Sequence, residues 1–182
     1  YESRVTSSYI ACFCPRCLKR FQQYAGLSTV PEPSEIPDSY MEQWTRFMCM
    51  QMAELAGKFR SALRACDESI RFSVYSGYQS EAHMRFYGID WSLLADKIDL
   101  GMVGYGRPLD ELNATRAALG KTPLVLGHIA YPYDVRQRTA PSYLSAASLL
   151  RRAADSTGGI LIYSLETLDA RTFNAIAIVS RI

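Results

Sequence analysis

Residues 98–130, IDLGMVGYGRPLDELNATRAALGKTPLVLGHIA, determine the fold class of this 182-residue chain. The stretch predicts a strand over Ile98–Tyr105, a helix over Leu109–Leu119 that stops at Gly120, and a second strand over Pro123–Ala130. Both strands are largely apolar, which is typical of parallel strands that are covered on both faces. This strand–helix–strand order predicts an α/β protein.

The same alternation extends in both directions from this stretch. On the N-terminal side the sequence predicts a short helix, a loop with three prolines and a long helix, and then a further strand and helix. On the C-terminal side it predicts a helix, a strand and a last helix. The predicted ranges are Cys17–Leu27 (helix), 28–37 (loop), Asp38–Cys66 (helix), Ile70–Ser76 (strand), Trp91–Asp96 (helix), Ser142–Ser156 (helix), Ile160–Ser164 (strand) and Asp169–Ser180 (helix).

Two arrangements of a parallel sheet fit this order, an open doubly wound sheet and a closed barrel. No glycine-rich phosphate loop follows any strand, which weighs against a nucleotide-binding open sheet. Aromatic and polar residues cluster just after the strands instead, where barrel enzymes keep their sites. We therefore expect one domain, residues 1–182, that forms the C-terminal half of a (β/α)₈ TIM barrel. Residues 1–37 hold the end of strand four and a cysteine-containing loop, and residues 38–182 supply strands five to eight.

Four strands cannot close an eight-stranded barrel, so this interpretation requires a partner for the sheet edges. The missing N-terminal half could be lost by truncation or reside in a separate segment, or two copies of the chain could pair as a homo-oligomer. The sequence leaves these alternatives open.

The composition excludes two classes of partner. The chain carries 20 basic and 18 acidic side chains, and a net charge of +2 gives no footprint for nucleic acid. No run approaches the ~18 consecutive apolar residues that a membrane span requires. The first residues lack the order of a signal peptide, and the compartment stays undetermined.

The segment Cys12-Phe13-Cys14-Pro15-Arg16-Cys17 holds three of the five cysteines. Thiols this close suit a shared metal better than separate disulfides, and the odd total argues against a disulfide framework. A zinc ion there would be structural, and the alternative is three reduced thiols without metal. Cys49 and Cys66 are expected to be small buried residues of the long helix.

Glu2 stands where a fourth barrel strand would end, and a carboxyl group there could protonate a glycosidic oxygen. The alternative is a surface residue near a chain end. Together with the cysteine motif and Phe21 in the following helix, this stretch resembles the glycoside hydrolase family 42 (β-galactosidase-type) barrels. The resemblance implies that Glu2 is the general acid/base and that the zinc thiolates are Cys12, Cys14 and Cys17, with a fourth thiolate from an upstream loop.

A glycosidase normally needs a second carboxylate. The family 42 resemblance implies a glutamate at the end of strand seven, but Leu124–Tyr131 contains none. We expect Glu166, at the end of the last strand, to take this role, with Asp99 and Asp134 as alternatives. Glu166 could instead cap the final helix or pair with Arg171.

Two further segments resemble the chitinase-like family 18 barrels: Met102-Val103-Gly104-Tyr105 resembles their sixth strand and 159–164 their eighth. This resemblance implies a strand-four glutamate as the acid and the acetamido group of the substrate as the nucleophile, assisted by the tyrosine. Such chemistry needs no second carboxylate.

The strand ends also supply the predicted sugar site. Tyrosine and tryptophan offer flat faces for sugar rings together with polar groups, although tyrosine is also common at any half-buried rim. A histidine there could bind hydroxyls or merely satisfy a backbone carbonyl. The predicted substrate-binding residues are Tyr75, Tyr105, His128, Tyr131 and Tyr163, with Tyr78, Trp91, Arg107 and Tyr133 as further candidates; His83, expected in a loop, receives no role.

The sequence thus predicts a glycoside hydrolase-like barrel that cleaves O-glycosidic bonds of an oligo- or polysaccharide. A catalytically silent carbohydrate-binding barrel and a zinc-organised interaction module remain as alternatives. The expected partners are a carbohydrate and the rest of the barrel, and no organic cofactor is expected.

Overall fold

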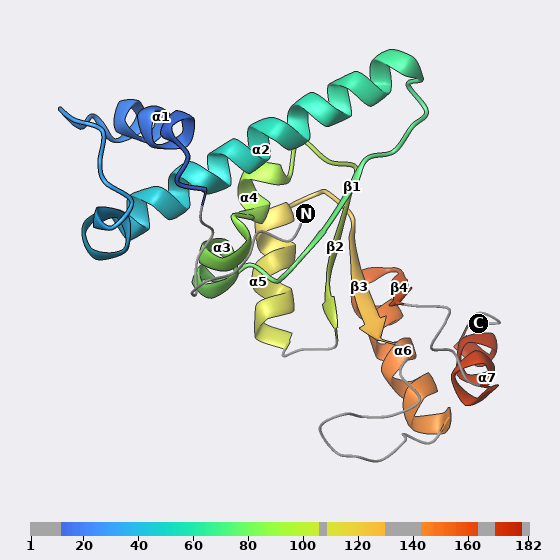
Figure 1. Cartoon of the computed structure of the whole chain (residues 1–182). Helices are drawn as coiled ribbons and strands as arrows, with labels where there is room; N and C mark the ends of the chain where they lie inside the picture. Colours follow the sequence, from blue (N-terminus) through green and yellow to red (C-terminus); the bar gives the residue numbers. More distant parts are fainter. Residues whose placement is uncertain (1–11, 106–108, 130–142, 164–169, 180–182) are drawn as a thin grey trace.

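The computed structural model describes residues 12–105, 109–129, 143–163 and 170–179. Within these ranges the predicted strands are all present, and helices alternate with them (Figure 1). None of the described helices combines the length and the apolar character of a membrane span. The elements are α1 (Pro15–Ala25), a π-helical turn η1 (Ile36–Tyr40), α2 (Met41–Cys66), β1 (Ser73–Ser76), α3 (Glu81–Tyr87), α4 (Trp91–Leu94), β2 (Leu100–Tyr105), α5 (Leu109–Leu119), β3 (Leu124–Ile129), α6 (Tyr143–Thr157), β4 (Ile160–Tyr163) and α7 (Ala170–Val179).

The strands form one parallel sheet in the order β1-β2-β3-β4. Ser76 lies beside Val103, Val103 beside Leu126, and Leu126 beside Ile160. Paired residues in neighbouring strands point to the same face, and side chains alternate along each strand. The sheet therefore has a covered face, made of Val74, Ser76, Gly101, Val103, Leu124, Leu126, Ile160 and Ile162, and an open face, made of Tyr75, Met102, Val125 and Leu161.

The helices pack on the covered face. Residues of α2, α4 and α5 share one buried core with Val103, Leu124 and Leu126, and α6 and α7 pack against Ile160 and Ile162. None of the buried clusters among the described residues includes a residue of the open face. A doubly wound sheet carries helices on both faces. The observed arrangement, with strands in chain order and helices on one face, is compatible with part of an α/β barrel.

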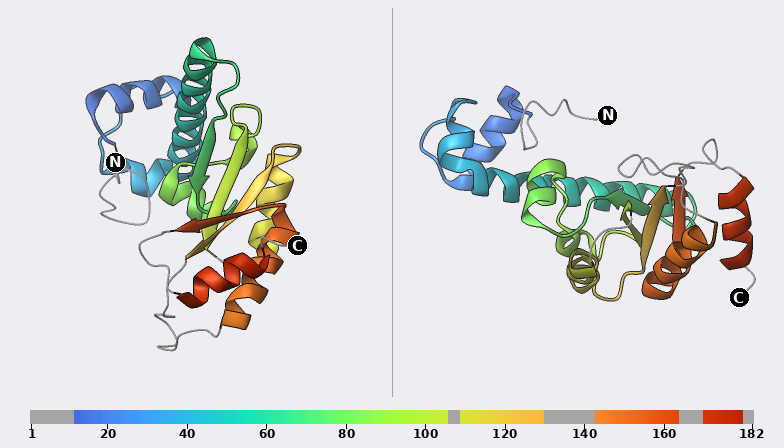
Figure 2. Two further views of the ribbon diagram at one scale, coloured as in Figure 1. Left: turned by 90° about the vertical axis from the view of Figure 1, so that its right-hand side faces the viewer. Right: turned by 90° about the horizontal axis from the view of Figure 1, so that it is seen from below.

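A second, aromatic core joins α1, η1 and the first half of α2. Phe21 and Trp44 are almost fully buried, and their ring centroids lie 5.0 Å apart. The other buried members are Leu18, Ile36 and Phe47. Figures 1 and 2 show that this unit lies beside the N-terminal half of α2, away from the sheet. Helix α1 begins at Pro15: proline has no backbone N–H, and the first residue of a helix has no intrahelical partner for one. The helix stops at the C-cap residue Gly26, whose φ is +67°.

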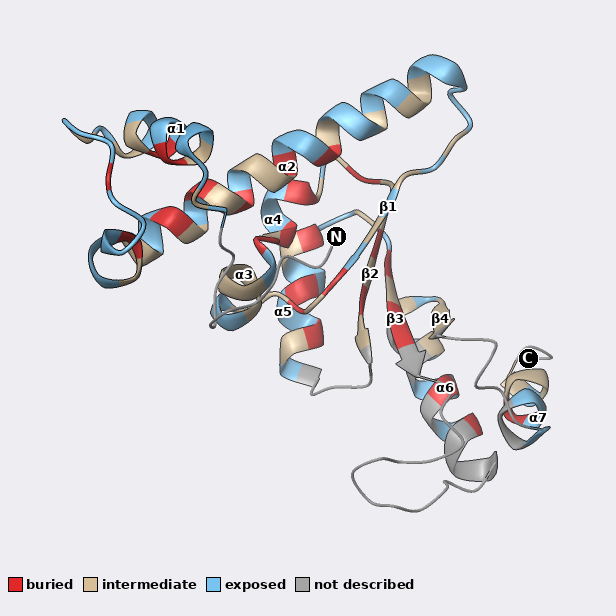
Figure 3. Cartoon of the chain, viewed as in Figure 1, coloured by how far each residue is buried: buried red, intermediate tan, exposed pale blue. Residues whose placement is uncertain are grey.

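Large apolar residues recur along α2 at a spacing of three to four, which predicts one buried stripe, and this prediction is partly wrong. Trp44 and Phe47 are buried, but Leu55 is 44% and Phe59 is 53% exposed. The second half of the helix instead buries Ala56, which belongs with the mid-helix Ala53 to the core that holds α4, because a small side chain allows close approach of two helices. Figure 3 shows the exposed surface along this half of α2.

Two smaller predictions also need correction. His83 is not in a loop: it belongs to α3, which Ser80 caps by accepting a hydrogen bond from the His83 backbone N–H. The serine cap and Gly88 at the C-terminus, with φ at +65°, were the available signals. Cys49 is buried as expected, but Cys66 is exposed because it ends α2.

Candidate functional site

The backbone brings four of the predicted sugar-binding residues to the end of the sheet where the strands finish. Tyr105 ends β2, His128 lies next to the end of β3, Tyr163 ends β4, and Tyr75 lies one residue before the end of β1. The register places Tyr105 beside Gly127, after an irregularity between Val103 and Tyr105. All four residues therefore sit at the carboxyl ends of parallel strands, as the sequence predicts.

Two tyrosines that follow each other closely in this region have opposite environments. Tyr75, on the open face, is 45% exposed, whereas Tyr78 is 2% exposed. The Tyr78 ring lies over Gly104, where an added Cβ would come within 2.8 Å of it. Tyr75 therefore presents part of its side chain to solvent, whereas Tyr78 belongs to the buried core.

Trp91, another predicted candidate for sugar stacking, is fully buried and is not a stacking surface. Its indole N–H donates a hydrogen bond of 2.8 Å to the carbonyl of Gly77. The side chain of Gln79 adds two more bonds, since its amide donates to Asp90 and its carbonyl accepts from the Trp91 backbone. The Gln79 backbone N–H donates to the Thr115 hydroxyl. These contacts hold the turn after β1 in place.

Glu111, in the first turn of α5, is a carboxylate that the sequence reasoning missed. Its Oε2 atom is inaccessible to solvent and has no hydrogen-bond partner among the described residues. Helix α5 follows the carboxyl end of β2, so this carboxylate starts from the same end of the sheet as Tyr75. Nothing in its sequence context separates it from the neighbouring Asp110, which is exposed. Glu111 is thus a candidate for the second carboxylate.

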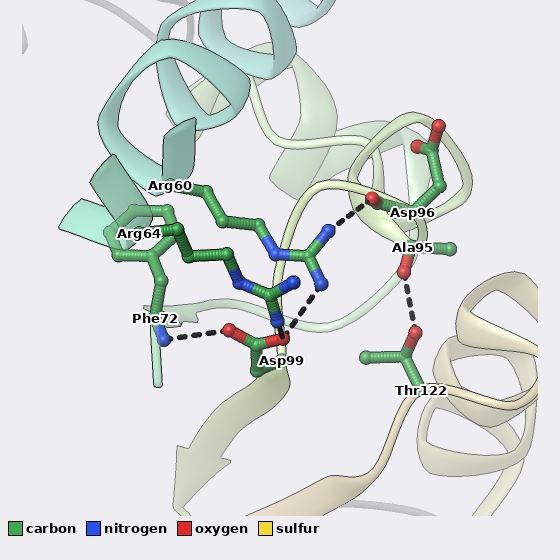
Figure 4. A network of polar contacts seen from close by, with 7 residues as sticks. All are labelled: Arg60, Arg64, Phe72, Ala95, Asp96, Asp99 and Thr122. Carbon is green, nitrogen blue, oxygen red and sulfur yellow. Dashed lines mark hydrogen bonds and ion pairs between the residues drawn. The ribbon is translucent and has the colours of Figure 1, made fainter. Parts of the chain in front are cut away.

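Asp99, considered above as a catalytic alternative, is excluded by its place. It directly precedes β2 and lies at the amino ends of the strands, opposite the tyrosines. Its carboxylate accepts hydrogen bonds of 2.7 Å from both Arg60 and Arg64 and one of 2.9 Å from the Phe72 backbone N–H (Figure 4). The Phe72 N–H and the Arg60 guanidinium lower the pKa of Asp99 to about 2. Its role is structural.

A groove of about 470 Å³ lies at this same end, between α2 and the turn before β2. Its walls include Lys97, which pairs with Asp96, and Arg60, which pairs with Asp99. Because these charges neutralise one another and the groove is remote from the tyrosines, we assign it no ligand.

The three cysteines of the N-terminal segment converge. The Sγ atoms of Cys12, Cys14 and Cys17 all lie within 4.8 Å of one another. Cys12 and Cys14 are exposed, and Cys17 is half-buried. The Cys17 thiol donates to the Cys12 sulfur at 3.7 Å. These residues could hold a metal ion.

The convergence follows from the start of α1. Cys14 is the N-cap residue, and Cys17 lies in the first turn. Hydrogen bonds from the backbone and side chain of Cys17 lower the pKa of the Cys14 thiol. Burial, with the neighbouring thiols of Cys14 and Cys12, raises the pKa of Cys17 to about 12. A bound cation must therefore displace the proton of Cys17.

Several predicted residues lie outside the described ranges: Glu2, Glu166, Tyr131, Arg107, Tyr133 and Asp134. Their roles stay predictions, as do the binding roles of Tyr75, Tyr105, His128 and Tyr163.

The structure is similar to that of a chitinase from Chromobacterium violaceum ATCC 12472, with a TM-score of 0.56 and 12% sequence identity. The match covers 95% of this chain and 87% of that chain. The likeness concerns the fold alone. No protein-family model and no curated protein sequence matches the chain, and the family 42 resemblance stays a prediction.

Proposed function

We propose that this chain belongs to a carbohydrate-active (β/α)₈ barrel that cleaves O-glycosidic bonds at the carboxyl ends of its strands. One observation carries the proposal: the open face of the sheet ends in the exposed Tyr75, at the same end of the sheet where Tyr105 and Tyr163 end their strands. Barrel enzymes bind their substrates at this edge. The likeness in fold to a chitinase agrees with a sugar substrate.

We further propose that the open face lines the interior of the barrel, where the strands of the N-terminal half cover it. Parallel sheets are normally covered on both faces, yet the apolar Met102, Val125 and Leu161 contribute to no buried cluster of the described residues. The partner of this face is therefore a set of further parallel strands, from the N-terminal half or from a second copy.

Two adjacent residues of β2 test the partner proposal, because Met102 points to the open face and Val103, fully buried, to the covered face. Met102→Lys should break the assembly. Size-exclusion chromatography with light scattering then shows a lower molecular mass, because the second copy or the N-terminal half is no longer bound. Val103→Lys is the matched control and should unfold the chain in either case. If Met102→Lys leaves the mass and the free energy of unfolding unchanged, the open face faces water and the barrel proposal fails.

For the chemistry, we propose Glu2 as general acid/base, with Glu166 or Glu111 as the second carboxylate. Chitin oligosaccharides and aryl β-galactosides are the substrates to test, since the two resemblances point to them. Glu2→Gln should abolish product release while leaving sugar binding and folding intact. Glycan binding without any turnover by the unsubstituted protein would favour the silent carbohydrate-binding barrel, which the missing carboxylate in β3 also favours.

We propose that the cysteine cluster binds a structural zinc ion. Zinc–sulfur bonds of about 2.3 Å in a tetrahedron separate the sulfurs by about 3.8 Å, close to the 3.7 Å between Cys17 and Cys12. The fourth ligand would come from outside the described residues, as the family 42 resemblance implies. Native mass spectrometry of the reduced protein should find bound zinc, lost in Cys14→Ser and kept in the control Cys66→Ser. Absence of zinc from the unsubstituted protein refutes the site.

A further inference from the structure

The cysteine cluster has a second chemical possibility, because two of its thiols are already in contact. The Cys17 thiol donates its hydrogen to the Cys12 sulfur at 3.7 Å, and Cys12 is exposed. A disulfide needs a sulfur–sulfur distance of about 2.05 Å. Cys12 precedes the first residue of α1 by three positions and lies outside any helix or strand, so it can approach Cys17 without disturbing α1.

We propose that Cys12 and Cys17 are a redox-modification site, at which a low-molecular-weight disulfide such as oxidised glutathione forms an intramolecular disulfide and expels the metal. This proposal rests on the proposed zinc site. Cys12 attacks one sulfur of the oxidant, whose S–S bond breaks and releases one reduced thiol. Cys17 then attacks the mixed disulfide at Cys12, which releases the second thiol. The two zinc-bound thiolates lose two electrons, the oxidant gains them, and two protons from water convert its two released thiolates into thiols.

The exchange removes the metal because thiolates, not disulfide sulfurs, bind zinc. After oxidation Cys14 is the single thiol left in the cluster, too few donors to hold the ion. Reduction by a dithiol restores all three. The cluster would therefore hold zinc only while it is reduced.

Tryptic digestion shows whether Cys17 is in a disulfide, and serine variants show which cysteine is its partner. Trypsin cleaves after Arg16, between Cys14 and Cys17, so a bond to Cys17 keeps two tryptic peptides covalently joined. Treatment of the zinc-loaded protein with oxidised glutathione should produce this joined pair together with the loss of bound zinc, followed with a colorimetric zinc chelator. The joined pair should persist in Cys14→Ser and disappear in Cys12→Ser, and Cys66→Ser should behave as the unsubstituted protein.

The outcomes separate the two proposals. If the reduced protein binds no zinc, the metal site fails, and the peptide linkage still reports on the disulfide. If zinc binds but oxidised glutathione neither joins the peptides nor releases the ion, the redox proposal is overturned. A linkage that survives in Cys12→Ser and is lost in Cys14→Ser also overturns it, because Cys14 would then be the partner of Cys17.

Discussion

The two ends of the sheet differ in how their polar groups are used. At the amino ends, the Asp99 side chain is 5% exposed and its carboxylate binds two arginines of α2 and a backbone N–H. At the carboxyl ends, the turn after β1 is held by the Trp91 indole and by Gln79, while Tyr75 remains 45% exposed. The first end is closed by its own interactions, and the second end keeps surface for a ligand.

This difference is the one expected of α/β barrels, where the amino ends of the strands serve stability and the carboxyl ends serve function. It gives each substitution a direction. Changes at Asp99 should reduce stability without a specific effect on sugar binding. Changes at Tyr75 should weaken sugar binding and leave stability nearly unchanged. Trp91, which supports the carboxyl ends from inside the core, should behave like a stability residue.

The largest effect is expected for Asp99→Ala. The substitution leaves Arg60 and Arg64 without their anion, and breaking a buried ion pair typically costs 3–5 kcal/mol. Because the two arginine side chains are 25% and 39% exposed, water compensates in part, and we expect a loss of about 3–4 kcal/mol in urea unfolding. Asp96→Ala is the control: this carboxylate is 77% exposed, so its loss should leave the free energy of unfolding nearly unchanged. Equal stability of the two variants would contradict the structural role of Asp99.

Trp91→Phe should come next, with a loss of about 2–3 kcal/mol, because it leaves the Gly77 carbonyl without its donor and opens a cavity. The Gly77 carbonyl lies at the carboxyl end of β1, so faster amide hydrogen exchange in 77–88 is expected as well. Tyr87→Phe removes a polar atom from a ring that is 45% exposed. It should leave the free energy of unfolding and the amide exchange rates unchanged. An unaltered exchange rate in Trp91→Phe would show that the indole does not hold this turn.

Acid should weaken the amino ends selectively. The folded-state pKa of Asp99 is lowered from 3.8 to about 2, so its stabilisation is complete above pH 4 and is lost as the pH falls toward 2. The shift corresponds to roughly 2 kcal/mol. Asp99→Asn keeps an acceptor for the Phe72 N–H but cannot titrate. Urea unfolding at pH 5 and pH 2.5 should therefore show a smaller difference in this variant than in the unsubstituted protein. The same difference in both would assign the acid sensitivity to other groups.

The predictable part of the fold is the part set by local pattern. The strand and helix over 98–119 follow from apolar runs and a glycine stop, and the structure places β2 and α5 there. Helix α3 was missed because it lacks an apolar stripe: the structure buries none of its residues, so only the Ser80 cap marks it.

What the sequence could not supply is which face a residue meets in three dimensions. Phe59 fits the apolar period of α2 but is 53% exposed, because neighbouring alanines make the contact. The two arginines that bind Asp99 lie 39 and 35 residues away in the sequence, so the structural role of Asp99 depends on contacts that local pattern does not show. The same limit applies to Tyr75 and Tyr78, three residues apart, of which one is exposed and the other buried.

The smallest effect on stability, and the most specific effect on function, is expected for Tyr75→Ala. A side chain that is 45% exposed contributes little to the core, so the free energy of unfolding should change by roughly 0.5 kcal/mol. Loss of a ring that stacks on a sugar removes about 0.5–1.5 kcal/mol of binding, which weakens binding of a chitin oligosaccharide about two- to tenfold in titration calorimetry. Tyr75→Phe keeps the ring face and should retain most of this affinity. Tyr87 has the same exposed fraction but lies on α3, and Tyr87→Ala should leave binding unchanged. If Tyr87→Ala weakens binding as much as Tyr75→Ala does, the sugar does not lie over the end of β1, and the carboxyl ends of the strands do not differ from the amino ends in function.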